Sequence, residues 1–508
     1  MKGGRRTLLL FMLLAGLSAS AQRIVYSEPD KDDTRRLNFE IVGKMNGNFL
    51  IYKNIRNKNW ISILDNDMKE VGKVEQDYLP DNERVLNVDF FAYPDFAYMI
   101  YQYRKKNIIY CAAAKIDGKG QKIGELISLD TTQVGAGGDS KIYSVLSSED
   151  KSKILVFKIN KKDRRLFAIT TILMDDKLEL LKKSRMSLPM EDRDDDYLSE
   201  FQLDNDGDLI FSKFNRVNNE NIGEASFIVK YAQADTFMSK SLKVEKFFLD
   251  EIRIKPDNVN KRYFLTSFYT KQKRGNTEGY YFYVWDKLNQ QVVIEDTAAF
   301  TDNLRREARG SASIKSAFND YFIRQIVMRR DGGFILAAES YYTTSRGSNM
   351  WNRWNYLSSP YYYRSFDYYY YSPYYSNSFW GNRYLDYQNV RYQADNITIQ
   401  SFDKNGKREW SSVITKEQFD DQSDDLISYQ IMNTGGQVHF LFNNLERRVQ
   451  LLTDFSLKPD GELTRNPTLK DLDRGYEFMP KYGKQVSARQ MIIPCVYRNY
   501  ICFAKLEY

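Results

Sequence analysis

The chain has 508 residues, of which 15% are aromatic, and it contains 27 glycines and 11 prolines. This composition excludes a disordered chain and fits a large core-forming β protein. The 74 Lys and Arg residues against 67 Asp and Glu residues give a formal charge of +7, and because both signs alternate along the chain, nucleic acid is not an expected partner.

The first 21 residues have the pattern of a secretory signal peptide. A basic MKGGRR start is followed by the apolar run TLLLFMLLAGL and by small residues at Ala19 and Ala21, which are typical of a cleavage site. The run is shorter than the ~20 apolar residues of a bilayer span, so an N-terminal anchor is the less favoured interpretation. We expect residues 22–508 to form a single soluble domain in the periplasm or outside the cell, not an integral membrane protein.

A repeated pattern then runs along the chain, in which a polar turn with Gly, Asn or Asp leads at once into an apolar β-rich run. Clear copies are NGNFLIYKN from Asn46, NDGDLIFSKF from Asn205, RDGGFILAAES from Arg330 and NTGGQVHFLFN from Asn433. Each is typical of a hairpin turn that enters a strand. A second run ending in a polar turn follows one strand later, so each unit has four strands, A to D.

These units begin near residues 38, 86, 141, 198, 250, 321, 427 and 484. Four-stranded units with a period of ~50 residues predict a β-propeller of about eight blades, with seven as the alternative. The eighth unit ends after its strand C, and the strand-like QRIVYSE at the mature N-terminus is free to supply strand D. We expect this pairing to close the ring and to cover an exposed sheet edge.

The turn followed by tryptophan in FDKNGKREW, Phe402 to Trp410, resembles the repeats of WD40-like and quinoprotein-like propellers of exported bacterial proteins. The resemblance covers most of the mature chain through short, degenerate motifs. It implies the fold and no activity, because the quinone-binding and metal-binding residues of the quinoprotein enzymes have no counterpart here. No cofactor and no metal are expected.

The segment DNDGD, Asp204 to Asp208, has three acids at alternate positions, as calcium loops do. It lacks the downstream glutamate of the EF-hand pattern and aligns with plain turns in other units, so a β-turn is the favoured interpretation. His439 is the sole histidine and lies within a strand, which argues against catalytic triads and favours a packed strand residue.

The sixth unit carries a long insertion between its strands B and C, from Tyr341 to Asp395. Tyrosine, serine, asparagine and arginine dominate it, a set that antibody paratopes also favour because tyrosine offers a large amphipathic contact surface. The alternative is a low-complexity loop that folds over the propeller face. The linker that enters this unit is also long and basic, and strand connectivity places both insertions on one face. The candidate binding residues are Trp351, Trp354, Trp380, Tyr361, Tyr362, Tyr363, Arg305, Arg306 and Arg309.

Glu339 is the one candidate catalytic residue, because it ends an apolar strand where the insertion begins. A structural role, in which it accepts hydrogen bonds, is the favoured alternative. Cys495 and Cys502 flank VYRNYI, and a hairpin centred on Arg498 and Asn499 places them directly opposite each other. A disulfide and a pair of small buried core residues are both open for these two cysteines.

Together these observations favour a non-catalytic binding or scaffolding propeller of the periplasm or cell envelope. The expected partner is an envelope protein or a glycan, held by the tyrosine-rich face. The competing hypothesis is a polysaccharide-acting enzyme that uses two carboxylates near the channel.

Overall fold

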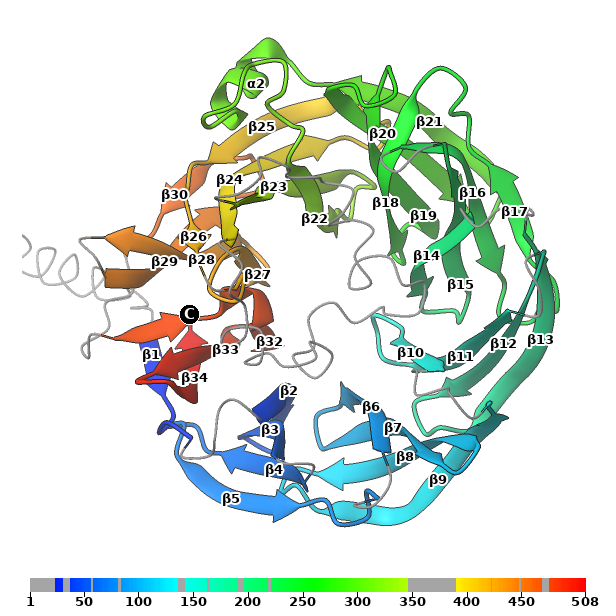
Figure 1. Ribbon diagram of the computed structural model, residues 1–508, viewed down its shortest axis with the longest axis vertical. Helices are drawn as coiled ribbons and strands as arrows, with labels where there is room; N and C mark the ends of the chain where they lie inside the picture. The colour runs from blue at the N-terminus through cyan, green and yellow to red at the C-terminus, as the bar shows by residue number, and fades with distance from the viewer. Residues whose placement is uncertain are drawn as a thin grey trace, which may run out of the picture.

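The computed structural model describes the chain at residues 23–30, 37–55, 58–80, 84–135, 142–161, 165–190, 196–217, 221–345, 390–421, 423–446, 449–467 and 475–508. Within these ranges, seven antiparallel sheets surround a central space (Figure 1). One of them has eight strands and consists of two four-stranded units that are joined by a single pair, Ile222 opposite Leu249, so the sheets comprise eight units. Each unit is a blade, and its strands A to D run from the centre outward. The predicted all-β propeller is therefore confirmed, with eight blades and not the alternative of seven.

The first four blades pair their strands in chain order. The first blade consists of β2 (Leu37–Met45), β3 (Asn48–Ile55), β4 (Lys58–Leu64) and β5 (Glu70–Glu75), and the second of β6 (Arg84–Ala92), β7 (Phe96–Lys105), β8 (Ile108–Asp117) and β9 (Lys122–Gln133). The third consists of β10 (Tyr143–Ser147), β11 (Lys153–Lys161), β12 (Leu166–Asp175) and β13 (Leu180–Pro189). The fourth consists of β14 (Asp196–Leu203), β15 (Leu209–Arg216), β16 (Ile222–Lys230) and β17 (Met238–Ser241). In each blade, strand A therefore bonds to B, B to C and C to D.

The last four blades contain the irregular elements. The fifth blade consists of β18 (Phe248–Asp257), β19 (Arg262–Thr270), β20 (Thr277–Asp286) and β21 (Gln291–Ala299), and the sixth of β22 (Tyr321–Met328), β23 (Phe334–Ser345), β24 (Val390–Phe402) and β25 (Arg408–Ile414). The seventh consists of β27 (Tyr429–Asn433), β28 (Val438–Glu446), β29 (Val449–Leu457) and β30 (Leu463–Arg465). The eighth contains β31 (Tyr476–Phe478), β32 (Lys484–Ser487), β33 (Gln490–Tyr497) and β34 (Tyr500–Glu507). Helix α2 (Asp302–Ala308) precedes the sixth blade, β26 (Phe419–Asp420) follows it, and the 3-10 helix η2 (Pro480–Tyr482) separates β31 from β32.

The first strands of seven blades begin within two residues of the positions that the repeat predicts. The eighth blade differs because its inner strand is split, and both β31 and β32 pair with β33. The repeated glycine has a conformational cause: Gly207, Gly332 and Gly435 have φ angles of 92°, 86° and 88°, a region that favours glycine. The predicted turn residues Arg498 and Asn499 both have positive φ, at 50° and 67°, as a two-residue hairpin requires.

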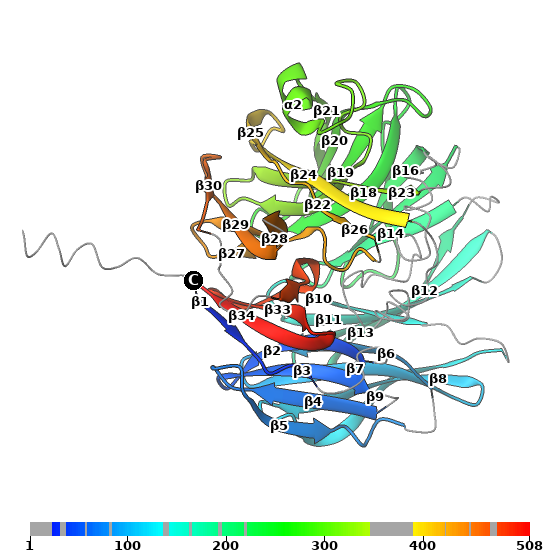
Figure 2. The ribbon, with the colours of Figure 1, turned by 60° about the vertical axis from the view of Figure 1, so that its left-hand side comes forward.

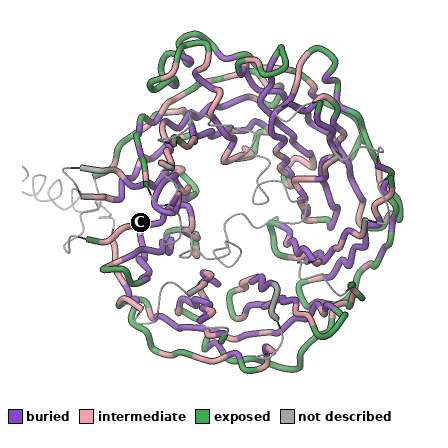
Figure 3. The backbone as a smooth tube through the Cα atoms, in the orientation of Figure 1, coloured by how far each residue is buried: buried purple, intermediate pink, exposed green. Residues whose placement is uncertain are grey.

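The hydrophobic core lies between the blades. Among the described residues there are eight buried clusters, and each contains residues of two neighbouring blades. One of them joins Phe39 and Phe49 of the first blade to Ile492 and Phe503 of the eighth. Figure 3 shows buried positions along the strands where blades face each other and exposed positions along the outer edge. Burial of apolar surface between blades is thus what holds the propeller together.

The N-terminal strand completes the eighth blade, as predicted. Strand β1 (Arg23–Tyr26) pairs antiparallel with β34, from Arg23 opposite Glu507 to Tyr26 opposite Ala504. The two strands lie side by side in both views (Figures 1 and 2). The chain therefore begins and ends in one sheet, and β1 covers an edge of β34 that would otherwise be unpaired.

No helix in the described ranges is both long and apolar enough to cross a membrane. The predicted signal peptide, residues 1–21, lies outside these ranges, so its assignment stays a prediction.

Candidate functional site

The tyrosine-rich insertion leaves the sixth blade on a two-stranded stem. Beyond the blade, β23 and β24 stay paired from Tyr341 opposite Ala394 to Ser345 opposite Val390. Strand β26 pairs with the other side of β24, so three strands support this part of the chain. The predicted insertion therefore begins and ends as regular strand, and only residues 346–389 lie outside the described ranges.

Hydrogen bonds and an ion pair of polar side chains hold the two strands of the stem together and attach them to a neighbouring linker. The hydroxyl of Tyr342 donates to Oδ2 of Asp395 at 2.9 Å. The guanidinium of Arg391 forms an ion pair with Asp421, with Nε 2.6 Å from Oδ1, and it lies 4.3 Å from the centre of the Phe419 ring. These contacts join the stem to the linker between the sixth and seventh blades.

The stem also contacts the linker that enters the sixth blade. The backbone N–H of Tyr341 donates to the carbonyl oxygen of Asp320 at 2.8 Å, and Nδ2 of Asn396 donates to the carbonyl oxygen of Ala308 at 3.4 Å. The two long connections of this blade therefore meet on one face, as the strand connectivity predicts. We refer to this face, which carries the B-to-C connections, as the B–C face.

Glu339 lies at the base of the stem and is fully buried. Its Oε1 atom is 2.9 Å from Nζ of Lys416, and its Oε2 atom is 3.4 Å from Nε of Arg324 and 2.5 Å from the hydroxyl of Ser428. The strands are irregular beside both Glu339 and Arg324, and such bulges redirect side chains. The structure thus places the catalytic candidate in a buried ion-pair network.

Lys416 has three polar partners within this network. Besides Glu339, its ammonium donates to the carbonyl oxygen of Ala394 at 2.6 Å and to Oε1 of Gln418 at 2.7 Å. Burial lowers the pKa of Lys416, and Glu339 acts in the opposite direction. Burial also raises the pKa of Asp395 above its usual range, although the hydrogen bond from Tyr342 favours the ionised form.

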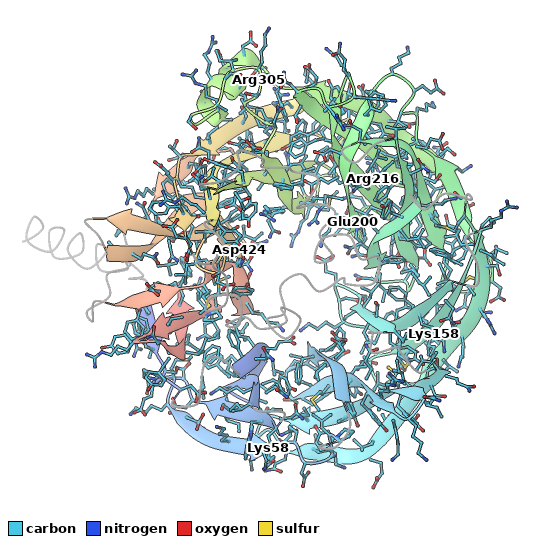
Figure 4. The ribbon with its side chains drawn as sticks, viewed as in Figure 1. Lys58, Lys158, Glu200, Arg216, Arg305 and Asp424 are labelled. Atoms are coloured by element: carbon cyan, nitrogen blue, oxygen red, sulfur yellow. The ribbon has the colours of Figure 1, made fainter. Side chains whose placement is uncertain are left out.

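A second group of charges lies next to the first, at the inner edge of the blades (Figure 4, Asp424). The ammonium of Lys481, from η2, is 2.9 Å from Oδ2 of Asp424. Asp425 accepts hydrogen bonds from Ser423 at 2.7 Å and from Tyr482 at 2.8 Å. Burial raises the pKa of Asp425, whereas Lys481 overcomes the effect of burial and lowers the pKa of Asp424.

These two groups place four carboxylates and three cations at the base of the stem. The carboxylates of Glu339, Asp395, Asp424 and Asp425 each have a cation or a hydroxyl donor within hydrogen-bonding distance. Hydrogen bonds and ion pairs are stronger in a low dielectric than in water, so these contacts restrict the movement of the side chains that form them. The arrangement is therefore suited to holding a projecting hairpin in one orientation.

The structure distributes the predicted binding residues unevenly. Arg305 is buried and donates to the backbone oxygens of Thr277, Glu278 and Lys315 at 2.9, 3.2 and 3.3 Å, at the outer rim (Figure 4). Arg306 bonds to Asn303 within helix α2. The candidates Trp351, Trp354, Trp380, Tyr361, Tyr362 and Tyr363 lie outside the described residues.

The segment Asp204 to Asp208 forms a turn whose carboxylates surround a lysine of the next blade. The ammonium of Lys287 lies 2.6, 2.7 and 2.8 Å from the carboxylates of Asp204, Asp206 and Asp208. The hydroxyl of Tyr263 donates to Asp204 and Asp208 at 2.8 Å each. A cationic side chain thus occupies the centre of the acidic loop, and the predicted turn is found.

His439 and the two C-terminal cysteines pack as strand residues. His439 is 5% exposed, with Nδ1 3.1 Å from both carboxylate oxygens of Asp454. Cys495 and Cys502 are direct cross-strand partners, as predicted, and their Sγ atoms lie 2.9 Å apart as free thiols.

Partly exposed tyrosines gather at the B–C face of other blades as well. In the second blade, Tyr103 and Tyr110 stack with ring centres 5.1 Å apart and planes inclined by 9°. In the eighth, Tyr476 stacks between Tyr26 at 4.2 Å and Tyr497 at 4.5 Å. Stacked aromatic rings are therefore not confined to the sixth blade.

Sequence reasoning missed the lysines that organise these sites, Lys287, Lys416 and Lys481. Lys287 lies in a turn, Lys416 in a linker and Lys481 in η2, and no local pattern marks any of them. Their acidic partners lie in the preceding blade for Lys287, in β23 of the same blade for Lys416 and in the linker after the sixth blade for Lys481.

Comparisons with known proteins give only remote structural similarities. No family model matches the chain, and no curated protein matches it. Prolyl oligopeptidase B from Galerina marginata is similar with a TM-score of 0.38 and 8% identity over 92% of this chain; the match covers 56% of that protein, so this chain spans little more than half its length. Dihydro-heme d1 dehydrogenase NirN matches with a TM-score of 0.35 and 11% identity over 92% of this chain and 70% of its own. The β-propeller domain of the Trilobed protease from Pyrococcus furiosus matches with a TM-score of 0.36 and 11% identity over 91% and 98% of the two chains.

Proposed function

We propose that this propeller is a non-catalytic binding or scaffolding protein of the periplasm or cell envelope, and that it recognises a protein or a glycan through the tyrosine-rich segment of its sixth blade. One observation carries the proposal: the segment extends from a regular two-stranded stem that pairs with β26 and contacts the linkers before and after the blade. A passive loop needs no such support, whereas a recognition element gains affinity when its attachment is rigid.

The composition of the segment supports the same function. Tyrosine and tryptophan supply large contact areas with few rotatable bonds, and serine and asparagine adapt their hydrogen bonds to a partner. The stacked tyrosines of the second and eighth blades extend aromatic surface along the B–C face, since Tyr103, Tyr110 and Tyr497 lie beside B-to-C turns.

The surroundings of Glu339 support binding over the competing enzymatic hypothesis. A general acid or base must reach the substrate. Glu339 has no exposed surface and already holds Lys416, Arg324 and Ser428, which fits a structural role.

The test replaces residues 346–389 with a short Gly-Ser linker and keeps both strands of the stem. We expect the shortened protein to fold, since loop-closure entropy changes little with length. It should lose capture of envelope proteins by cross-linking and lose signal on a glycan array, whereas the full mature chain binds in one of the two assays.

A matched pair of variants separates specific contacts from bulk. Replacing Trp351, Trp354 and Trp380 with alanine should weaken capture more than replacing Ser358, Ser359 and Asn377 with alanine, because aromatic anchors dominate interface energetics. If the shortened protein folds and captures the same partners as the full chain, the binding site is elsewhere and the proposal is wrong.

A further inference from the structure

A second polar site lies at the junction between the second and third blades. A cavity of about 350 Å³ is lined by Lys158, Asn160, Thr170, Lys183, Ser184 and Arg185. All six residues belong to β11, β12 and β13 of the third blade. The site lies across the central space from Asp424 and the stem (Figure 4, Lys158), so it is independent of the function proposed above.

Two lining residues, Lys158 and Lys183, pair with a carboxylate of the second blade and so join the two blades. Nζ of Lys158 is 2.5 Å from Oδ2 of Asp130, on β9, and 2.8 Å from the hydroxyl of Thr132. The side chains of Lys158 and Asp130 are 12% and 11% exposed. Nζ of Lys183 lies 3.1 Å from the other oxygen of Asp130. One carboxylate therefore holds two lysines.

Asp130 stays ionised in this position. Burial opposes its ionisation, but hydrogen bonds from Lys158 and Lys183 lower its pKa below the usual range. It therefore contributes one negative charge against the three positive charges of Lys158, Lys183 and Arg185. Asp235, which accepts a hydrogen bond from the lining Ser184, forms an ion pair with Lys182, so an excess of two positive charges remains.

The strand register brings the remaining cations to one face. Arg185 is the cross-strand partner of Thr170, which in turn is the partner of Lys158, so the three side chains form a row across the blade. Lys183 lies two residues before Arg185 on β13, and residues at this spacing project from the same side of a strand. A guanidinium, an ammonium, a hydroxyl and the amide of Asn160 therefore border the same space.

We propose that this pocket binds an oxyanion, the carboxylate, phosphate or sulfate group of a ligand about the size of one sugar. Arginine donates paired N–H groups that match the geometry of such groups, and lysine adds a mobile point charge. The six lining residues include no aromatic ring, which disfavours a neutral ring that binds by stacking. The volume is at the lower end for small-molecule sites, which fits a single sugar or a small acid.

Isothermal titration calorimetry of the mature chain at constant ionic strength tests the proposal with inorganic phosphate, sulfate and glucuronate, and with glucose as the neutral match for glucuronate. We expect saturable binding of at least one anion and none of glucose. Tighter binding of glucuronate than of phosphate identifies an acidic sugar as the source of the oxyanion, and the reverse order identifies a phosphate or sulfate group.

The variant Lys183→Ala/Arg185→Ala should bind the anion with at least tenfold lower affinity. Lys177→Ala/Lys182→Ala is the matched control, because it removes two positive charges from the same blade outside the cavity and should change affinity less than twofold. Circular dichroism and thermal unfolding confirm that both variants are folded. Equal weakening by the two variants, or no saturable binding with affinity better than on the order of 10 mM, would overturn the proposal.

Discussion

The ammonium of Lys416 lies 2.9 Å from Oε1 of Glu339, and both side chains are almost completely shielded from solvent. Glu339 ends the part of β23 that lies within the blade, whereas Lys416 is in the linker that leaves the same blade. Together with Arg324 and Ser428 they connect the base of the stem to the seventh blade. This relationship makes the sixth blade sensitive to the loss of a single charge.

We expect Glu339→Gln to lower the free energy of unfolding by about 3 to 5 kcal/mol, because it leaves the buried ammonium of Lys416 without its counter-charge. Urea unfolding followed by tryptophan fluorescence measures the loss. The double variant Glu339→Gln/Lys416→Gln should recover part of it. Glu462→Gln is the control, since its pair with Lys458 is exposed and should contribute little to stability. A double variant as unstable as Glu339→Gln would contradict this account.

We expect Asp395→Asn to stabilise the protein at pH 7. Burial raises the pKa of Asp395 in the folded state, so stability falls as the pH rises from its unfolded pKa through its folded pKa. Asparagine removes this titration and still accepts the hydrogen bond from Tyr342. The unfolding midpoint of the variant should therefore exceed that of the unaltered protein at pH 7, and this difference should shrink as the pH falls to 3. A difference that grows as the pH falls would contradict the conclusion that ionisation of Asp395 destabilises the folded state.

We expect Lys287→Met to destabilise the contact between the fourth and fifth blades by about 3 kcal/mol, because three carboxylates lose their shared cation. Burial lowers the pKa of Lys287, but the three hydrogen-bonded carboxylates raise it above the usual value, so its stabilising effect is fully present at pH 7 and is lost only at alkaline pH. Thermal unfolding at pH 7 measures the difference.

Calcium gives a second test of the same site. In Lys287→Met the three carboxylates of Asp204, Asp206 and Asp208 lose the ammonium between them, and a calcium ion could take its place. Calcium at millimolar concentration should therefore raise the unfolding temperature of Lys287→Met more than that of the unaltered protein. Lys261→Met, which removes a half-exposed partner of Asp206 alone, is the control and should gain less.

We expect deletion of residues 23–28 to lower stability by about 3 kcal/mol or more, because the half-buried residues of β1 and their ladder with β34 are lost. The deletion also removes the bond from the Ser27 N–H to the carbonyl oxygen of Phe503 at 2.9 Å. The reference is the chain that begins at Gln22. Differential scanning calorimetry measures the change, and light scattering should show association through the unpaired edge of β34. Unchanged stability would refute the role of β1.

We expect Cys495 and Cys502 to form a disulfide when the purified protein meets a mild oxidant, since their thiols lie 2.9 Å apart on paired strands. Mass spectrometry of the denatured protein should show the loss of two hydrogen atoms. Cys111 is buried in a different blade and should stay reduced. Two free thiols after oxidation would favour the alternative of small core residues.

The sequence by itself determined the arrangement along the chain. The turn residues at Gly207, Gly332 and Gly435 need a positive φ, and the apolar runs after them need a core. Both are local requirements, so their spacing predicts eight four-stranded blades and the missing outer strand that β1 supplies. The pairing of Cys495 with Cys502 follows from the hairpin turn at Arg498 and Asn499.

Only the tertiary structure decided which charges meet. Lys287 reaches the acids of the preceding blade, Lys158 reaches Asp130 across a blade junction, and Lys416 reaches Glu339 through the fold of one blade. The twist and packing of whole blades bring these side chains together, and neither leaves a periodic signal in the sequence. A lysine in a polar turn is ordinarily solvated, and it acquires a specific role only when packing removes water from around it and leaves a carboxylate as its neighbour.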